Sequence, residues 1–309
     1  MNEPVAPEPI DELRAAIGEN DSAAAELCLD EMSPNESALA VTRLDEEDPS
    51  HLLEMLTPES AAQLLEELPD SESAAIVDRL PTEEAAEILD EVSSDAQADI
   101  LGRLSEDHAE AILNEMAPAH AEDARRLLQY DAESAGGLMI SEYLRYSSDL
   151  KVDDVLSDLR ANADRYRGYD VQYAYVISPE DELVGVLRMR DMLLAEHTKS
   201  LSDLMIRDLL MVNVDQSLGE LIAFFDRHHF LGVPVVDSDQ KLVGVLRQND
   251  VREAAAESAD RTLLKLTGIA GGEELRTMPI RLRSTRRLSW LSINIVLNIV
   301  AASVIAMYQ

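Results

Sequence analysis

A repeat of 12 residues constrains most strongly what the first half of this chain can fold into. Residues 21–128 divide without a gap into nine blocks of 12 residues, and the last position of every block is apolar: Met32, Leu44, Leu56, Leu68, Leu80, Val92, Leu104, Met116 and Leu128. Block positions 8 and 9 are mostly apolar too, so each block carries one helical stripe. We expect one short helix per block. Because helices this short are marginal alone, the blocks should stack into a solenoid.

Capping residues at the block starts support this interpretation. They are Ser33, Thr57, Thr82, Ser93 and Ser105. After Ser33, a proline occupies the first helical position and Glu36 completes a capping box. Residues 1–20 begin with several prolines, and we expect them to form a flexible tail before the solenoid.

The chain is strongly acidic, with 61 Asp and Glu against 26 Lys and Arg and a formal net charge of −35. This charge excludes a general nucleic-acid binder, which needs a basic surface. It is explained either by adaptation of the surface to a salty cytoplasm or by carboxylates that bind a hard divalent cation. Acids such as Glu66 and Asp90 recur on the outer rows of the blocks. Asp95 and Asp99, at i and i+4, are close enough to share a cation, although a solvated face is the plainer explanation of any single pair.

The sequence shows no pattern typical of a catalytic or redox site. The six histidines are scattered, no nucleophile stands with a base and an orienting group, and Cys28 is the single cysteine. We therefore expect a protein that is not an enzyme and that has no multi-cysteine metal site.

Two segments of the second half resemble each other at a distance of 59 residues. Residues 173–177 and 183–187 precede Asp191, and residues 233–237 and 241–246 precede Asp250. Each segment predicts two short strands joined by a polar turn and followed by a helix that begins near the aspartate.

These segments resemble the CBS domain, a β-β-α module that occurs in pairs. The resemblance implies that the two modules pack side by side and that they bind an adenine nucleotide such as ATP or take part in dimerisation. In nucleotide-binding members the aspartate holds the ribose, which implies Asp191 or Asp250 here. An aspartate at a helix start can equally cap its own helix, so both interpretations stay open.

The C-terminal part of the sequence predicts an acidic helix and a membrane span. Glu253, Glu257 and Asp260 align on one side of the predicted helix at i, i+4 and i+7. Four arginines within residues 281–287 precede residues 288–308, which carry no formal charge and would span about 31 Å as a helix. The arginines place the start of this span in the cytoplasm. A buried helix of a soluble domain is the alternative. No signal peptide is expected, so the preceding residues should stay inside the cell.

The order of these parts resembles the MgtE family of magnesium channels and transporters. The most specific stretches are residues 133–139, both CBS signatures, residues 271–276 and residues 287–291. The resemblance implies a multidomain fold: an all-α short-helix solenoid, an α+β tandem CBS pair, a connecting helix and one transmembrane helix. The expected boundaries are a tail at 1–20, the solenoid at 21–130, the CBS domains at 137–200 and 201–256, the connecting or plug region at 257–287 and the transmembrane helix at 288–309.

The resemblance also implies a function. Family members are homodimers whose cytosolic domains sense Mg²⁺: ions bridge acidic surfaces, and the plug helix then closes the pore. Carried over residue by residue, the implied metal ligands are Asp95, Asp99 and Asp250, together with the acids Glu253, Glu257 and Asp260 of the connecting helix, where Ser258 stands in place of an expected acid.

Location and partners follow from the same resemblance. We expect a protein of the inner (plasma) membrane with residues 1–287 in the cytoplasm, partnered by a second copy and by the remaining transmembrane pore domain, before which this sequence stops. The alternative is a membrane-tethered CBS module that senses adenine nucleotide and regulates another partner.

Overall fold

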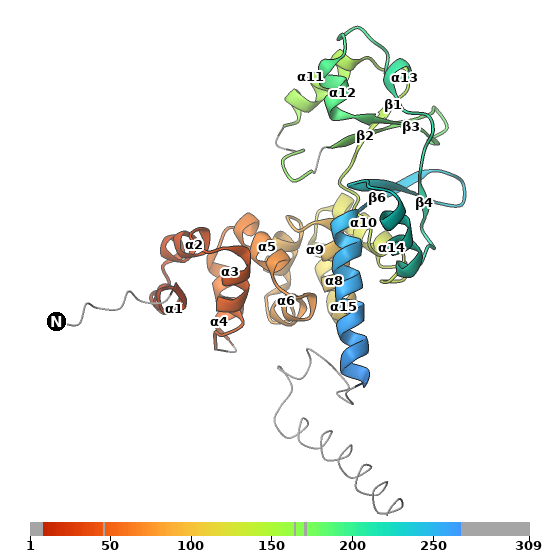
Figure 1. Cartoon of the computed structure of the whole chain (residues 1–309). Coiled ribbons are helices and arrows are strands. Elements are labelled where there is room, and N and C mark those ends of the chain that lie inside the picture. Colours follow the sequence, from red (N-terminus) through yellow and green to blue (C-terminus); the bar gives the residue numbers. More distant parts are fainter. Residues whose placement is uncertain (1–8, 46, 164, 170–171, 267–309) are drawn as a thin grey trace, which may run out of the picture. The chain divides into compact units, whose positions relative to one another are not determined.

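The first part of the chain is a stack of short helices (Figure 1). The computed structural model describes residues 9–45, 47–163, 165–169 and 172–266, without the side chains of 260–266. Its first ten helices, here called the helical domain, are α1 (Pro9–Glu19), α2 (Ser22–Asp30), α3 (Pro34–Val41), α4 (Asp48–Met55), α5 (Pro58–Glu67), α6 (Asp70–Val77), α7 (Thr82–Leu89), α8 (Ser94–Arg103), α9 (Glu106–Glu115) and α10 (Pro118–Leu127). Helices α2 to α10 each fall within one 12-residue block, which confirms the predicted solenoid.

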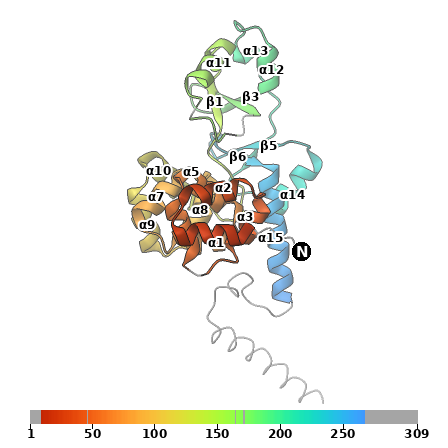
Figure 2. The ribbon, with the colours of Figure 1, turned by 90° about the vertical axis from the view of Figure 1, so that its left-hand side faces the viewer.

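The structural repeat of the helical domain is two blocks long. Helix α5 packs against α7, α6 against α8, α7 against α9 and α8 against α10, so alternate helices form two rows (Figure 2). The apolar positions of the blocks, including Leu64, Ile76, Ile88, Ile100 and Ile112, are almost fully buried in one continuous core. The 12-residue period therefore encodes each helix, and a 24-residue period encodes the stacking.

The expectation of a flexible tail over residues 1–20 is wrong for residues 9–19, which form α1. Pro9 begins the helix, and Leu13, Ala16 and Ile17 are buried against the core. These three residues stand at i, i+3 and i+4, the spacing of a helical stripe. The prolines before the helix obscured this short pattern.

Two similar three-stranded sheets follow. In the first module, β1 (Leu144–Ser147) pairs parallel with β2 (Tyr173–Ile177), which pairs antiparallel with β3 (Leu183–Arg188). In the second, β4 (Val212–Asn213), β5 (Gly232–Val236) and β6 (Leu242–Arg247) pair in the same way. Their helices are α11 (Val152–Ala161), α12 (Met189–Leu194), α13 (Leu201–Leu204) and α14 (Leu218–Arg227). The predicted strands are confirmed to within a residue or two.

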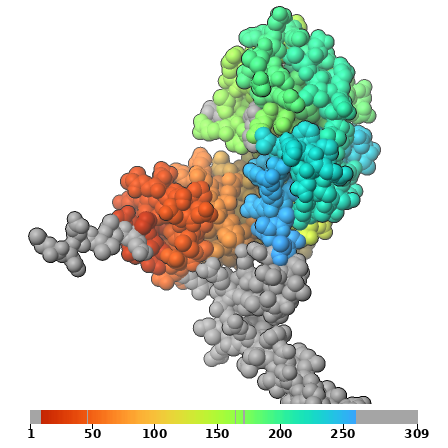
Figure 3. Space-filling model, in the orientation of Figure 1, coloured from red at the N-terminus to blue at the C-terminus, as the bar shows by residue number. Residues whose placement is uncertain are grey.

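The 59-residue spacing extends to the finest details of the two modules. The antiparallel pairs are irregular at Val176/Ile177 and at Val235/Val236, and the turns place Asp181 and Gln240 at positive φ. Such equivalence shows that the second module repeats the backbone of the first. The two modules lie side by side (Figure 3), with a bridge between Glu182 and Lys241.

Each central hairpin is completed by a Leu-Met-Ile segment from outside its own three strands. Ile140 bridges to Val245 of β6, and Ile206 bridges to Val186 of β3. The preceding methionine packs directly over a hairpin glycine: a Cβ atom on Gly244 would collide with Met139, and one on Gly185 would collide with Met205. Both glycines are thus required by close approach, because any larger residue would displace the methionine.

The last described helix is α15 (Gln248–Leu266), and the chain divides into two compact units at its fifth and sixth residues, Arg252 and Glu253. No helix in the described part of the chain is both long enough and apolar enough to cross a membrane. The membrane span expected at residues 288–308 lies outside the described residues.

Candidate functional site

Charged residues from distant parts of the sequence meet where the helical domain contacts the second module. Asp95 lies in the first turn of α8, where the positive end of the helix dipole favours a carboxylate. Arg247 ends β6, and Asp250 lies in the first turn of α15. Glu142 belongs to the segment that connects α10 to β1.

The guanidinium of Arg247 links the two aspartates. Its Nη2 donates to Asp95 Oδ2 at 3.1 Å, and its Nε donates to Asp250 Oδ2 at 2.7 Å. The side chain of Arg247 is 33% exposed, and those of Asp95 and Asp250 are 17% and 15% exposed. Ion pairs this sheltered from water are screened less than surface pairs. Oδ1 of Asp95 is buried and has no hydrogen-bond partner within the described part of the chain.

Glu142 adds a third carboxylate to this junction. It accepts hydrogen bonds from the amide of Ser94 at 3.1 Å and from the Ser94 hydroxyl at 2.8 Å, and the amide of Ser141 donates to the same hydroxyl at 2.9 Å. Burial raises the pKa of Glu142, the bonds from Ser94 oppose that rise, and the charge of Asp95 adds to it. The first turn of α8 is therefore held by the connecting segment.

The pKa of Asp250 is also displaced. Burial raises it to about 6, and the nearby charge of Asp95 contributes in the same direction, while Arg247 opposes the rise. Although burial alone would lower the pKa of Arg247, its bond to Asp250 and the charges of both aspartates raise it. The guanidinium is thus charged at every physiological pH, whereas Asp250 titrates in the mildly acidic range.

Other contacts join the same two surfaces. Arg126 of α10 donates to the carbonyl of Val243 at 2.9 Å, and the hydroxyl of Tyr143 donates to the carbonyl of Leu242 at 3.3 Å. The amides of Ile140 and Val245 each donate to the other residue's carbonyl. The second module is therefore hydrogen-bonded to α10 and to the segment that connects α10 to β1, in addition to its contact with α8.

The structure brings together two of the six predicted metal ligands, Asp95 and Asp250. Asp99 lies one turn further along α8 and is half-buried. Glu253 and Glu257 are exposed on α15 in the second compact unit, and the side chain of Asp260 is outside the described residues. Over the described side chains, no group of three or more His, Cys, Asp or Glu is arranged to hold a metal ion. Sequence reasoning did not find Arg247 or Glu142, because neither belongs to an acidic pair on one helix.

Two acids expected to be solvated, Glu66 and Asp90, instead cap helices of the stack. Glu66 accepts from the amide of Ser93 at 2.7 Å, and Asp90 accepts from the amide of Ala117 at 2.9 Å and lies 3.0 Å from Nδ1 of His120. In each of these two hydrogen bonds, the backbone amide lies 27 residues after the acid, slightly more than two blocks. The sequence signal that could have predicted these caps is an acid that recurs about two blocks before the start of a helix.

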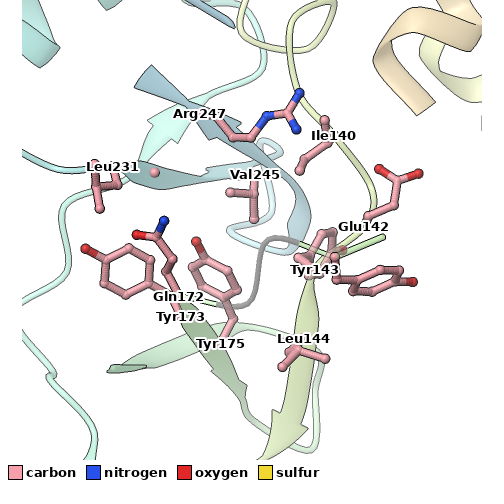
Figure 4. A pocket seen from close by; sticks show the side chains of 12 residues that line it. Ile140, Glu142, Tyr143, Leu144, Gln172, Tyr173, Tyr175, Leu231, Val245 and Arg247 are labelled. Atoms are coloured by element: carbon pink, nitrogen blue, oxygen red, sulfur yellow. The ribbon is translucent and has the colours of Figure 1, made fainter. Parts of the chain in front are cut away.

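A second candidate site is a cleft between the two modules, with four tyrosines among the twelve residues that line it. Figure 4 shows Tyr173 and Tyr175 projecting from β2 toward Val245, with Arg247 at the far side. Tyr143 and Tyr175 form an edge-to-face pair with ring centroids 6.0 Å apart. The enclosed volume is about 30 Å³, the space of one water molecule.

The two predicted ribose ligands have different surroundings. Asp191 is exposed in the first turn of α12, whereas Asp250 is bonded to Arg247. Asp250 also accepts a hydrogen bond from the backbone amide of Arg247, the residue that precedes α15, and this bond opposes the rise of its pKa. The helix-cap alternative therefore has support at Asp250.

Comparison with known proteins matches two parts of the chain to family models. Residues 20–133 match the model of the MgtE intracellular N domain, and residues 201–257 match the model of the CBS domain. The magnesium transporter MgtE of Bacillus subtilis is 28% identical over 184 residues, which are 59% of this chain and 40% of that protein. This chain thus spans about 40% of the length of the curated relatives it matches.

Two solved structures share the fold over most of the described residues. The soluble part of a magnesium transporter superposes with a TM-score of 0.72 at 23% identity and covers 81% of this chain and 98% of its own. The cytosolic domain of the Mg²⁺ channel MgtE in complex with ATP superposes with a TM-score of 0.71 at 28% identity and covers 79% of this chain and 99% of its own. The similarity therefore includes both the helical domain and the paired modules.

Proposed function

This chain belongs to the MgtE family, and we propose that its described part is a non-enzymatic Mg²⁺ sensor that controls ion transport. In this proposal the sensor lies on the cytoplasmic side of the inner membrane and works as a homodimer. It is coupled through α15, with its exposed acids Glu253 and Glu257, to a transmembrane pore domain.

The observation that carries the proposal is the meeting of Asp95 from the helical domain with Asp250 from the second module. Their residues are 155 apart in sequence, yet one guanidinium contacts both carboxylates. Carboxylate oxygens are the ligands that Mg²⁺ prefers, and Mg²⁺ commonly takes one or two carboxylates and keeps several waters. The buried, unpartnered Oδ1 of Asp95 provides an acceptor suited to such an ion.

Electrostatics gives the junction its response to Mg²⁺. Asp95, Glu142 and Asp250 carry three carboxyl groups, against one guanidinium, so bringing the two surfaces together concentrates negative charge. A divalent ion that binds carboxylates of both surfaces stabilises the joined arrangement, because it binds that arrangement more tightly than the separated one. Rising Mg²⁺ should therefore favour the compact, closed form.

The test is a Mg²⁺ titration of the purified full chain at fixed, high NaCl, followed by protease protection of the segment between α10 and β1. We expect protection to rise with Mg²⁺. Asp95→Asn should weaken this response, whereas Asp191→Asn, at the exposed equivalent position of the first module, should leave it unchanged. An equal response in all three proteins, or none in the unmodified chain, would rule out bridging at Asp95.

The tyrosine-lined cleft favours a second candidate function, the binding of an adenine nucleotide. Tyrosine faces stack on nucleobases, and the strand register places Arg145 beside Tyr175. The similar MgtE cytosolic domain was solved in complex with ATP. Because the enclosed space holds only a water molecule, a nucleotide would have to bind at the open side of the cleft or widen it.

Calorimetric titration with ATP and AMP tests this second function. We expect ATP to bind the unmodified chain, with affinity reduced by Tyr173→Ala and by Asp191→Ala. Heat of binding that is unaffected by both changes would place the nucleotide elsewhere.

A further inference from the structure

We propose that Arg247 is a built-in competitor of the divalent cation: its guanidinium joins Asp95 to Asp250 when Mg²⁺ is low and must be displaced before an ion can bridge them. The proposal rests on the proposed Mg²⁺-sensing function. It assigns to Arg247 the setting of the Mg²⁺ concentration at which the sensor responds.

The geometry shows a cation already shared by both surfaces. Nε and Nη2 of Arg247 contact different carboxylates, one from each side of the junction, at 2.7 and 3.1 Å. A guanidinium is always protonated and offers several donors in a fixed fork, so one arginine can hold two acids. The junction can therefore close to some degree without a metal ion.

The charge balance makes displacement feasible. One positive charge faces the carboxyl groups of Asp95, Glu142 and Asp250, so the junction is incompletely neutralised by Arg247 alone. A divalent cation supplies twice the charge and can use the oxygen of Asp95 that has no partner. Arg247 is 33% exposed, more than either aspartate, so the guanidinium can move toward water without crossing the core.

The first module provides a natural control. Arg188 ends β3 as Arg247 ends β6, and Asp191 follows it as Asp250 follows Arg247. Yet Arg188 is exposed, and no ion pair to it occurs among the described side chains. The bridge thus depends on the presence of α8 opposite the second module and not on the local Arg-x-x-Asp sequence.

Hydrogen–deuterium exchange of the full chain tests the proposal first in the presence of a chelator. The amides of Ser94, Ser141, Ile140 and Val245 report on the junction, because each donates to a group across it or beside it. We expect Arg247→Gln to raise exchange at these amides at least about threefold, because Asp95 and Asp250 then repel each other. Arg188→Gln should exchange like the unmodified chain.

The second arm repeats the exchange measurement during a Mg²⁺ titration. Without its internal competitor, Arg247→Gln should reach half-maximal protection at about one tenth of the Mg²⁺ needed by the unmodified chain, a difference of about 1.4 kcal/mol. Arg247→Lys, which keeps the charge but loses the fork, should shift the midpoint in the same direction by a smaller factor.

The outcomes separate this inference from the function on which it rests. If the unmodified chain shows no response to Mg²⁺, the proposed function fails, while the chelator arm still decides whether Arg247 joins the two surfaces. A second outcome is that Mg²⁺ protects the unmodified chain while both Arg247 variants have the same Mg²⁺ midpoint as Arg188→Gln and the same amide exchange in the presence of chelator. That result would show that Arg247 does not compete with the ion. A higher Mg²⁺ midpoint in Arg247→Gln would also overturn the proposal, because it would make the arginine a helper of the ion.

Discussion

At the scale of single residues, the junction combines groups that differ in how firmly they hold their charge. Arg247 remains protonated, whereas the pKa of Asp250 is raised to about 6 by burial and by the charge of Asp95. Unfolding returns the Asp250 carboxyl to the ordinary range near 4. The folded chain therefore binds more protons than the unfolded chain between these two values.

This difference predicts how stability depends on pH. Because the folded state binds more protons, the contribution of Asp250 to the free energy of unfolding is largest below pH 4 and falls as pH rises to about 6. Each pKa unit corresponds to about 1.4 kcal/mol, so the fall amounts to a few kcal/mol at most. Glu142, whose pKa is also raised, acts in the same direction.

Urea unfolding of the full chain at pH values between 4 and 6.5 measures this effect. Asp250→Asn should flatten the pH dependence over that range relative to the unmodified chain. Asp191→Asn, at the exposed equivalent site, should keep the slope. Parallel curves for all three proteins would mean that Asp250 titrates normally in the folded chain.

At the scale of elements, helices and strands could be predicted from the sequence wherever their apolar residues repeat at a short, regular spacing. The 12-residue blocks predicted nine helices because most of them bury the apolar residues at positions 8, 9 and 12. The repeated strand pairs were visible because both their apolar runs and their turns recur. Helix α1 was missed because its stripe of Leu13, Ala16 and Ile17 is short and follows three prolines. Strands β1 and β4 were missed because they contain only four and two residues.

The capping acids of the helical domain lead to a prediction at this scale. Asp90 accepts from the amide of Ala117, which precedes α10, and contacts His120 within that helix. Asp90→Ala should lower the free energy of unfolding by about 1–2 kcal/mol, because it leaves the start of α10 without an acceptor. The adjacent Glu91 is exposed.

Thermal or urea unfolding of Asp90→Ala and Glu91→Ala distinguishes structural acids from acids that only charge the surface. We expect Glu91→Ala to change stability by less than about 0.5 kcal/mol, as is usual at exposed positions. Equal losses in the two variants would show that the negative charge, and not the cap, matters at this point of the stack.

At the scale of the whole molecule, the candidate site could be predicted only in part. Asp95 and Asp250 were identified because each matches a family motif in its own domain. Their meeting through Arg247 could not be predicted, since it depends on how α8 packs against the second module, 152 residues away in sequence. The same packing brings in Glu142, which no local pattern distinguishes from the other acids of a chain with a net charge of −35.

In the tandem modules, too, the contacts between distant segments could not be predicted from the sequence. Their strands are encoded locally, but Met139 and Met205 pack over glycines of hairpins to which they do not belong. The contact of Met139 with Gly244 ties the segment after the helical domain to the second module, whereas Met205 packs over Gly185 of the first module. The position of the junction thus depends on the order of the segments along the chain.

The central claim is that one Mg²⁺ ion is held jointly by Asp95 and Asp250. A double-mutant cycle tests it most directly: the midpoint of Mg²⁺-dependent amide protection is measured for the full chain, for Asp95→Asn, for Asp250→Asn and for the double variant. If both carboxylates hold the same ion, the double variant should respond nearly as weakly as either single variant, with a coupling of at least about 1 kcal/mol. Additive changes, or midpoints equal to that of the unmodified chain, would contradict the account.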